Sequence, residues 1–504
     1  MTAPTYDLGK LHGGLRLPAH KRESTARPIR DVPVPSQLIL PTEQHVGGPA
    51  QPVVAVGDHV LKGQLIAAPD GELGAPVHAS SSGTVVAIEQ RPVSRRHGET
   101  APCIVIECDG NDEALPGAAI TDYRKLAPAE LQLRILDGGI VGLGGAVFPT
   151  AQKLMQARMC NIEYLILNGV ECEPYISCDD ALMRERAAEI LSGAQVLMHA
   201  LQVDVCFVVV ESDKPEAIQR LGEVLAELDD ERIVLKQVPT IYPSGGEDQL
   251  VQLVTNREVP SSGLPTDVGC VVQNVGTAAA VHDWVLRNEP LISRVTTVTG
   301  DGVQSPANLR ARIGTTIENV VAHAGGYTDR ATHMIIGGPM TGRSITTDEV
   351  PLVKASNCVL VLSELPDIAE ELPCIRCGDC AAVCPVQLQP QQLFWYICAD
   401  DESKLRDYGL TDCIECGCCD LVCPSHIPLT ADFRKAKGRM RELADEKARA
   451  ERARMRFEAR NVRILGEQRE RDAELIRQKE SAKVAGPAAI AEILKRKQNK
   501  DDSE

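Results

Sequence analysis

The chain has 504 residues, a formal net charge of −17 at pH 7 and 3% aromatic residues. Binding of nucleic acid needs a positive surface and aromatic stacking platforms, so we expect no nucleic-acid partner. The apolar runs, such as VDVCFVVV at 203–210, are too short to cross a bilayer, and MTAPTYDLGKLHGG lacks the apolar core of a signal peptide. With no export signal, the 18 cysteines indicate reduced thiols and metal binding, hence a cytoplasmic polypeptide.

Residues 1–125 are predicted to form a β-rich module. In VAVGDHVLKGQLIAAPDGELGAPVHASSSGTVVAIE (54–89), short apolar pairs alternate with Gly and Asp, a pattern typical of tight turns between short strands. This stretch resembles the lipoyl or biotinyl hammerhead, in which a lysine at the hairpin tip carries the cofactor. No lysine stands between Lys62 and the end of the repeat. We therefore expect a structural barrel-sandwich hybrid and not a carrier domain.

Two further modules and a tail have their own patterns. Between 126 and 290, strand-like runs such as YLILNGVE alternate with helical stretches such as KPEAIQRLGEVLAEL, which predicts a layered α/β domain. The span 291–365, with the strand and glycine turn of THMIIGGPMTGR, is similar to a β-grasp module of the soluble-ligand-binding (SLBB) kind. Residues 431–504 are charged and rich in helix formers, which predicts a solvated helix followed by a disordered end.

Two cysteine motifs occupy the predicted module at 366–430. Both follow C-x2-C-x2-C-x3-C-P, the pattern of ferredoxins with two clusters, in which the fourth cysteine of each run ligates the other cluster. The predicted ligands of one [4Fe-4S] cluster are Cys374, Cys377, Cys380 and Cys423, and those of the other are Cys413, Cys416, Cys419 and Cys384.

Structural zinc is the competing interpretation of these motifs, since four thiolates also make a tetrahedral zinc site. Zinc accounts for neither the third cysteine of each run nor the repeated C-P ending, so two [4Fe-4S] clusters are favoured. Cys418 falls outside the spacing and is predicted to be surplus. Cys270, Cys358 and Cys398 are predicted to be small buried hydrophobes.

A glycine-rich loop, GGIVGLGGAVFPTAQK at 138–153, precedes the strands of the α/β domain. It fails as a dinucleotide fingerprint, because Val147 stands where the third glycine is needed. The loop is either a plain tight connection or a cradle in which successive N–H groups hold a phosphate. NGVECEPYISCDD (168–180), YPSGGEDQL (242–250) and VVQNVGTAAAV (271–281) put amides and acids at strand-to-helix junctions, where α/β ligand sites form.

The motifs glycine loop–FPT–Lys, N-x-x-E-x-E-P, Y-x-x-G-x-E and N-V-x-T resemble, in this order, those of the flavin subunit of respiratory complex I. With the N-terminal hammerhead and the double ferredoxin motif, residues 5–430 are similar to the C subunits of Rnf electron transport complexes. The resemblance implies a multidomain α/β and α+β fold. Its parts would be a barrel-sandwich hybrid, a complex I flavin-subunit-like α/β domain, a β-grasp (SLBB) module and an α-helical ferredoxin-type domain with two [4Fe-4S] clusters.

The resemblance also implies a site for FMN and for NADH as substrate. The implied contacts are Gly142, Gly144, Gly145 and Lys153 at the FMN phosphate and ring, Phe148 on the NADH side, Asn168 at the flavin, Glu171 and Glu173 near flavin and nicotinamide, Tyr242, Gly245 and Glu247 closing the pocket, and Gln273, Asn274 and Thr277 at the flavin tail. The sequence departs from the complex I pattern at Leu143, where arginine is usual, and at Val170, which replaces an aspartate. Gly246 replaces the first of two glutamates, and Gly276 replaces another. These departures remove charge around the flavin and the nucleotide.

The implied function is electron entry, since a hydride carries two electrons, a cubane accepts one, and a flavin can split the pair without a catalytic acid or base. The family resemblance implies an NAD:ferredoxin oxidoreductase subunit, peripheral on the cytoplasmic face of the inner membrane, in a complex that moves Na⁺ or H⁺. Its partners would be the ferredoxin-type B subunit, the membrane subunits A, D, E and G and, indirectly, ferredoxin or flavodoxin. Two alternatives stay open: a flavoprotein subunit of a soluble NAD-linked dehydrogenase or hydrogenase, and an electron-transfer scaffold with a vacant flavin pocket.

Overall fold

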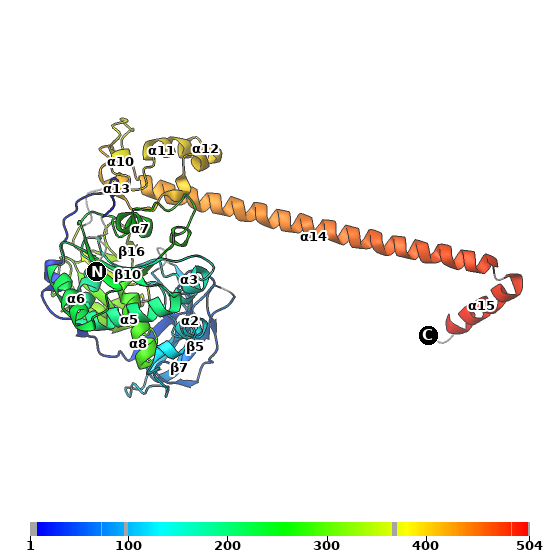
Figure 1. Ribbon diagram of the computed structural model, residues 1–504, viewed down its shortest axis with the longest axis horizontal. Helices are drawn as coiled ribbons and strands as arrows, with labels where there is room; N and C mark the ends of the chain where they lie inside the picture. The colour runs from blue at the N-terminus through cyan, green and yellow to red at the C-terminus, as the bar shows by residue number, and fades with distance from the viewer. Residues whose placement is uncertain (1–7, 72, 95–98, 365–369, 485, 502–504) are drawn as a thin grey trace. The chain divides into compact units, whose positions relative to one another are not determined.

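The computed structural model describes residues 8–71, 73–94, 99–364, 370–484 and 486–501. The chain divides into two compact units, residues 1–433 and 434–504. In the described part of the first unit there are four β-sheets, and helices lie near some of their strands (Figure 1). The predicted boundary at 365/366, between the β-grasp and ferredoxin-type modules, lies outside the described residues.

The barrel-sandwich consists of two small antiparallel sheets, with the strand orders β2-β8-β7-β4 and β3-β5-β6. Alternate residues of the longer strands, such as Leu38, Leu40, Ile104 and Ile106, are fully buried and share one core with Ile66 of the smaller sheet. The strands are β2 (Gln37–Pro41), β3 (Gln51–Pro52), β4 (His59–Val60), β5 (Leu65–Ala68), β6 (Val77–His78), β7 (Gly83–Pro92) and β8 (Thr100–Cys108).

Residues 8–31 lie outside these two sheets and contact other modules. The backbone N–H of Gly9 donates to the carbonyl of Leu253 at 2.7 Å, and Leu15 and Tyr242 exchange backbone hydrogen bonds of 2.7 and 2.8 Å. After the short helix α1 (Arg22–Thr25), strand β1 (Arg30–Asp31) pairs in parallel with β14 (Ala307–Arg312) of the β-grasp sheet. The segment therefore ties the α/β domain to the β-grasp module.

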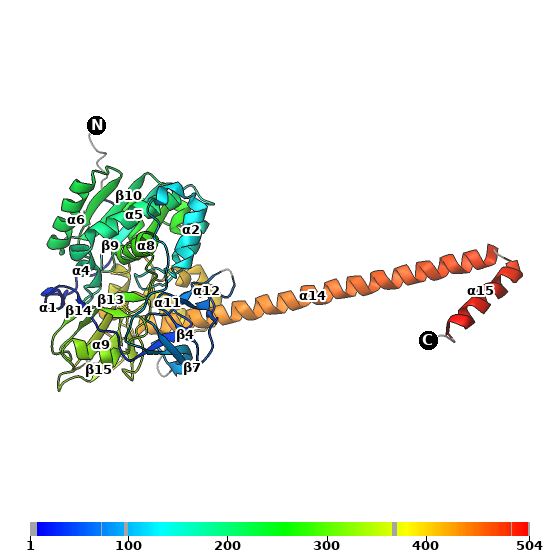
Figure 2. The ribbon, with the colours of Figure 1, turned by 90° about the horizontal axis from the view of Figure 1, so that it is seen from below.

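The α/β domain has a parallel four-stranded sheet in the order β11-β10-β9-β12. Leu165 and Leu167 of β9 face a helical layer that includes α5 and α8, which lie beside β9 and β10 in Figure 2, whereas Ile166 faces α7. The elements are α2 (Pro128–Asp137), α3 (Thr150–Ala157), β9 (Tyr164–Gly169), α4 (Cys178–Glu185), α5 (Ala187–Leu201), β10 (Val205–Glu211), α6 (Pro215–Leu228), β11 (Ile233–Val238), α7 (Glu247–Thr255), β12 (Cys270–Asn274) and α8 (Val275–Arg287).

This strand order contains a topological switch. From β9 the chain adds β10 and β11 on one side and then returns to place β12 on the other side of β9. The connections after β9 and β12 therefore leave the sheet in different directions. In sheets of this kind the crevice at such a point, outside the carboxyl ends of the strands, is where ligands bind.

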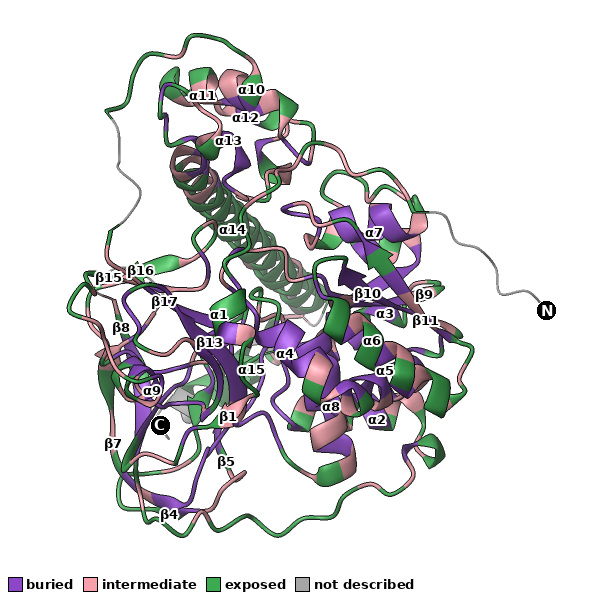
Figure 3. Ribbon diagram, turned by 90° about the vertical axis from the view of Figure 1, so that its left-hand side faces the viewer, coloured by how far each residue is buried: buried purple, intermediate pink, exposed green. Residues whose placement is uncertain are grey.

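The β-grasp module is a mixed sheet in the order β1-β14-β13-β17-β15-β16, packed against α9. Its core includes Val298, Leu309, Val320 and Val359, and Figure 3 shows β13 and β17 as buried strands. The remaining elements are β13 (Ser293–Thr299), α9 (Ile317–His323), β15 (His333–Ile336), β16 (Arg343–Ile345) and β17 (Cys358–Leu362).

The segment that carries the cysteine motifs repeats one backbone pattern twice. Gly378 and Gly417 have positive φ angles of 89° and 78°, and the short helices α10 (Asp379–Ala382) and α13 (Cys418–Leu421) begin directly after them. Arg376 and Glu415, at matching positions, also have positive φ angles of 58° and 56°. Between the two copies lie α11 (Pro390–Cys398) and α12 (Glu402–Asp407). The sequence repeat is therefore also a structural repeat.

Helix α14 (Leu429–Val484) begins at the end of the first unit, and the second unit consists of the rest of α14 and α15 (Gly486–Asp501). Pairs at i, i+4 spacing, such as Arg454–Glu458 and Arg463–Glu467, support the exposed helix. Within the described ranges, no helix has both the length and the apolar character needed to cross a membrane.

Candidate functional site

The glycine loop, the end of β9 and the end of β12 meet at the topological switch. Asn168 and Asn274 are direct partners in the register of the two strands, so both amides lie at the same edge of the sheet. The glycine loop lies against this edge, because a Cβ atom added to Gly144 would be 3.7 Å from the Cβ of Asn274. These three of the segments that the sequence singled out are thus adjacent, and the fourth joins them through a hydrogen bond between Asn168 and Gly245.

The loop itself is a tight turn that exposes its backbone. The N–H of Gly142 donates to the carbonyl of Phe148 at 2.8 Å, and the N–H of Val147 donates back to Gly142 at 3.2 Å. Between them, Gly144, Gly145 and Ala146 are exposed, and their N–H groups donate to no acceptor among the residues that the structure describes. Gly145 has a φ of 108°, and a Cβ added there would meet no atom within 4 Å. Successive free N–H groups beside open space fit a phosphate.

Thr277 of α8 anchors this loop. Its Oγ1 accepts a hydrogen bond of 2.9 Å from the N–H of Leu143, and Thr277 is fully buried. Leu143 stands where the complex I pattern has arginine, and its side chain is 7% exposed and packs in the hydrophobic core. The departure therefore exchanges a charge for a core contact.

Asn168 and Asn274 shape the crevice through backbone contacts. The amide of Asn168 donates to the carbonyl of Gly245 at 2.9 Å, in the turn before α7, and accepts from the N–H of Val170 at 3.1 Å, just after β9. The amide of Asn274 caps α8 by accepting from Gly276 N–H at 2.8 Å. Both predicted residues are therefore at the site, with part of their hydrogen-bonding capacity used to frame it.

The side chains of Lys153 and Gln273 differ in whether their donors have hydrogen-bond partners within the chain. The ammonium group of Lys153 forms a salt bridge with Glu247 and donates to the carbonyl of Val272 at 2.8 Å. Gln273 is 3% exposed, and its Nε2 has no hydrogen-bond partner in the part of the chain that the structure describes. A buried amide donor without an acceptor fits a site that a polar ligand completes.

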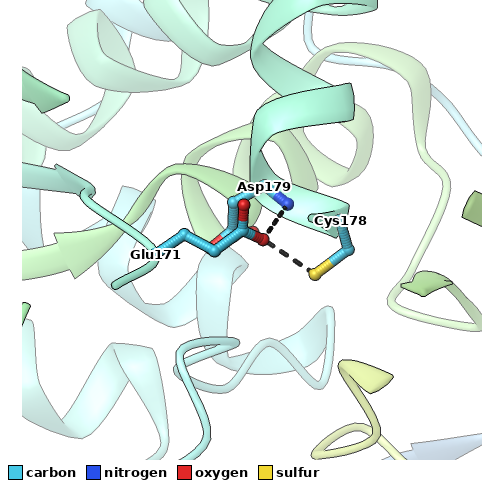
Figure 4. Close-up of side chains that lie close together, drawn as sticks. All are labelled: Glu171, Cys178 and Asp179. Atoms are coloured by element: carbon cyan, nitrogen blue, oxygen red, sulfur yellow. Dashed lines mark hydrogen bonds between the residues drawn. The ribbon is translucent and has the colours of Figure 1, made fainter. Parts of the chain in front are cut away.

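Glu171 caps a helix. Figure 4 shows its carboxylate beside Cys178 and Asp179, at the start of α4. It accepts from the backbone N–H of Asp179 at 2.7 Å and of Asp180 at 3.1 Å, and burial raises the pKa of Glu171 to about 7. The structure thus places this carboxylate at the N-terminus of α4, where the helix dipole also favours negative charge.

Glu173 holds a turn of the β-grasp module. Its carboxylate accepts from Met340 N–H at 2.9 Å and from the N–H and hydroxyl of Thr341 at 2.8 and 2.6 Å. Phe148, expected on the NADH side, lies within the glycine loop and is half-buried. The contact between Glu173 and the 340–341 turn joins segments far apart in the sequence, and no local signal could have predicted it.

Tyr242 reaches the cysteine motifs. The ring is buried, and its hydroxyl donates a hydrogen bond of 2.7 Å to the backbone carbonyl of Cys416. Desolvation, followed by the charges of Glu173 and Cys416, raises the pKa of Tyr242 well above its ordinary value. The residue predicted to close the flavin pocket therefore also contacts the second cysteine run.

The structure gathers the eight motif cysteines into the two sets that the spacing predicts. One cavity has mostly apolar walls and includes Cys374, Cys377, Cys380 and Cys423 in its lining, together with Ile375, Phe394, Ile427 and Leu429. The second is lined by Cys384, Cys413, Cys416 and Cys419, together with Val386, Leu388, Ile414 and Phe433. Each run thus contributes three cysteines to one cavity and its fourth to the other.

The spacing of the sulfur atoms bears on the identity of the metal group. A tetrahedral zinc ion with Zn–S bonds of about 2.3 Å needs sulfur atoms about 3.8 Å apart. Within the described ranges, no three of these sulfur atoms lie within 4.8 Å of one another. The thiols are therefore farther apart than a single tetrahedral zinc ion requires.

The four cysteines that were predicted to lie outside the ligand sets are in different environments. Cys418 is fully buried in the second cavity, and its hydrogen bond lowers the pKa of the Cys416 thiol to about 7. Cys270 and Cys358 are buried, as predicted. The prediction for Cys398 was wrong: this residue, at the last position of α11, is exposed.

Three family models match the chain. The Nuo51 FMN-binding domain matches residues 135–283, the RnfC barrel sandwich hybrid domain matches residues 9–111, and the SLBB domain matches residues 295–344. These matches agree with the predicted order of modules.

Curated relatives extend the similarity to most of the chain. A Pseudomonas aeruginosa protein, named as the C subunit of an ion-translocating oxidoreductase complex, is 49% identical over 464 residues, which cover 92% of this chain and 60% of that protein. Proteins named in the same way from Serratia proteamaculans and Haemophilus influenzae are 43% and 40% identical and are covered to 65% and 70%. The chain therefore spans less than two thirds of the length of the first two of these relatives.

A solved structure, that of an NAD⁺-reducing [NiFe]-hydrogenase in the H2-reduced state, aligns with 63% of this chain and 62% of its own chain. The sequence identity is 18% and the TM-score is 0.42, a similarity too low to bear on function.

Proposed function

Because this chain belongs to the family of C subunits of ion-translocating oxidoreductase complexes, we propose that it is the NADH-oxidising, electron-entry subunit of such a complex. In this proposal, FMN binds at the glycine loop, NADH is the substrate, and two [4Fe-4S] clusters occupy the two cysteine cavities. The overall reaction links NADH and ferredoxin to the movement of Na⁺ or H⁺.

The observation that carries the proposal is the exposed glycine loop at the switch point, in the same compact unit as the two cysteine sets. The free N–H groups of Gly144, Gly145 and Ala146 would hold the FMN phosphate, and the unpaired amide of Gln273 would donate to a polar group of the flavin. When bound, a flavin supplies the conversion of a two-electron hydride into single electrons. Thr277 and Asn274 fix the backbone around it.

The cysteine geometry supports clusters in preference to zinc. Apolar residues make up much of the lining of both cavities, and the wide spacing of the sulfur atoms fits a cubane better than a single tetrahedral ion. The proposed ligands remain Cys374, Cys377, Cys380 and Cys423 for one cluster and Cys384, Cys413, Cys416 and Cys419 for the other.

The proposed setting is the cytoplasmic face of the inner membrane, where the chain would be a peripheral subunit. Its proposed partners are the ferredoxin-type B subunit and the membrane subunits A, D, E and G, with ferredoxin or flavodoxin as indirect partners. The names of the curated relatives support membership of such a complex.

Anaerobic reconstitution of the full chain tests the proposal. We expect about one FMN and about eight irons per chain. NADH should then bleach the flavin absorbance and produce the EPR signals of reduced clusters. Stoichiometric flavin without reduction by NADH would remove NADH as the substrate. A chain that takes up clusters but no flavin would instead be the electron-transfer scaffold that the missing charges at Leu143, Val170 and Gly246 favour.

A further inference from the structure

Arg294 is a buried cation that connects the β-grasp module to the glycine loop. It lies on β13 and is 6% exposed. Its Nη2 donates a hydrogen bond of 2.5 Å to the backbone carbonyl of Leu143, and its Nη1 donates to the backbone carbonyl of Lys354. No pattern in the sequence connects this arginine with the glycine loop, because 151 residues separate it from Leu143.

The hydrogen-bond partners of Arg294 are unusual for a buried guanidinium. Its oxygen acceptors are two backbone carbonyls, and Nε has no partner among the residues that the structure places. Burial is the first cause that lowers the pKa of Arg294, and the nearby Cys178 and Asp179 oppose it. A buried charge is costly to desolvate, so its retention at this point calls for a specific role.

The role follows from the peptide group that Arg294 contacts. The carbonyl of Leu143 and the N–H of Gly144 belong to one peptide group. Arg294 binds the carbonyl side, while the N–H side is exposed and has no acceptor in the described parts of the chain. A charged donor on the carbonyl polarises the peptide, which makes its N–H a stronger hydrogen-bond donor.

The preceding peptide is fixed as well. The N–H of Leu143 donates to Thr277 Oγ1 at 2.9 Å, so Leu143 is held on its N–H side by α8 and on its carbonyl side by β13. With both sides of Leu143 held, the orientation of the Gly144 N–H is set before any ligand arrives. Such pre-organisation favours binding, because the loop loses less freedom when the ligand binds.

We propose that Arg294 is a positioning residue for the phosphate of the flavin: it orients the Leu143–Gly144 peptide and strengthens the Gly144 N–H as a donor to a phosphate monoester. The inference rests on the proposed FMN site and deepens it. It gives the β-grasp module a part in the flavin site of the neighbouring α/β domain.

The test compares FMN with riboflavin, which has the same ring and lacks the phosphate. The dissociation constants of both are measured by fluorescence quenching on the full chain, for the wild type, Arg294→Met, Arg294→Lys and Arg310→Met. Arg310 is the matched control, because it lies on the adjacent strand β14, is half exposed and pairs with Asp31 at 2.5 Å. Circular dichroism and thermal unfolding check that each variant is folded.

We expect Arg294→Met to weaken FMN binding roughly tenfold or more while riboflavin binding changes much less. Arg294→Lys, which keeps the charge, should recover part of the difference, and Arg310→Met should bind both ligands like the wild type. If Arg294→Met does not fold, Arg294→Gln replaces it; this variant keeps a neutral donor and should still lower the preference for FMN over riboflavin.

Equal weakening of FMN and riboflavin would reduce Arg294 to a structural clamp and overturn the inference. Unchanged binding of both would overturn it too. A wild-type chain that binds neither flavin would be a different result, because it removes the proposed flavin site itself.

Discussion

The hydroxyl of Tyr242 lies 2.7 Å from the backbone carbonyl of Cys416, so the α/β domain touches the loop that carries the second cysteine run. Two further contacts reach the same cysteine set. The N–H of Gly14 donates to the carbonyl of Val383 at 2.9 Å, and a Cβ added to Gly417 would lie 3.5 Å from Met340. By contrast, Cys377 of the first set is exposed. Residues at or beside the second set therefore contact the α/β domain, the N-terminal segment and the β-grasp module.

Replacing Tyr242 with phenylalanine should perturb one cluster and leave cofactor content unchanged. The variant keeps the ring and removes a buried hydroxyl that donates to Cys416, at a cost of about 1 kcal/mol in the free energy of unfolding. We expect a lower thermal midpoint, unchanged FMN and iron per chain, and an altered EPR spectrum or midpoint potential for the second cluster alone.

Ser261→Ala is the matched control for Tyr242→Phe. The Ser261 hydroxyl also joins the α/β domain to the cysteine module, through a hydrogen bond of 2.7 Å to Asp412, but this contact is exposed. The Ser261→Ala variant should leave the EPR spectra of both clusters unchanged. Equal spectral effects of the two substitutions would mean that the tyrosine acts through general docking and not through Cys416.

The two cysteine sets predict which substitutions remove the same cluster. Cys423→Ser should abolish the EPR signal that Cys377→Ser abolishes, because both residues line the first cavity. Cys384→Ser should abolish the signal that Cys413→Ser abolishes. Each variant should retain about four irons, measured with EPR on anaerobically reconstituted chains.

Cys418→Ala serves as the control within the same motif. It shares the second cavity but lies outside the ligand spacing, so both signals and about eight irons should remain. Loss of a cluster in this variant would make Cys418 a ligand. If Cys423→Ser and Cys413→Ser removed the same signal, each run would hold its own cluster and the crossed assignment would be wrong.

The two cysteine sets and the alternation of strands and helices in the α/β domain could be predicted, because each depends on the spacing of residues close together in the sequence. The C-P ending marks Cys384 and Cys423 in their own runs, and apolar alternation marks the strands. What Glu173 and Arg294 contact could not be predicted, because each meets backbone groups of a segment more than 150 residues away. Burial of Cys398 was predicted wrongly, since the sequence of α11 does not say which of its faces meets a partner.

Glu173→Gln separates a structural role for this carboxylate from a role at the nicotinamide. Its three hydrogen bonds to Met340 and Thr341 are charge-assisted, and the amide would lose the charge and part of the acceptor capacity. We expect the free energy of unfolding to fall by about 1–2 kcal/mol. The KM for NADH should stay unchanged.

Asp348→Asn is the control for Glu173→Gln, because the Asp348 carboxylate accepts a hydrogen bond of 2.8 Å from Tyr327 within the β-grasp module. It should cost less stability than Glu173→Gln. A raised KM for NADH with unaltered thermal unfolding in Glu173→Gln would place this carboxylate at the nucleotide, as the resemblance to complex I implies.

Lys354 is buried where three modules meet. Its ammonium group donates to the carbonyls of Pro76 at 2.8 Å and Gly139 at 2.7 Å, and burial lowers the pKa of Lys354 to about 7. The neighbouring His45 and His78 also have lowered pKa values, chiefly because of burial and with a contribution from Lys354; that of His78 falls to about 3. Both imidazoles are therefore neutral above pH 7.

Stability should consequently rise with pH in a defined window. Between pH 7 and about 10.4, the unfolded chain keeps the lysine proton that the folded chain has lost, so the free energy of unfolding increases by up to about 1.4 kcal/mol per pH unit. Lys354→Met removes this titration. The difference in thermal midpoint, wild type minus variant, should therefore grow from pH 7 to pH 8.5. Lys62→Met, at a lysine paired with Asp112 at 2.6 Å, should give a constant difference over the same range. A constant difference for Lys354→Met as well would show that Lys354 keeps its proton in the folded chain throughout this window.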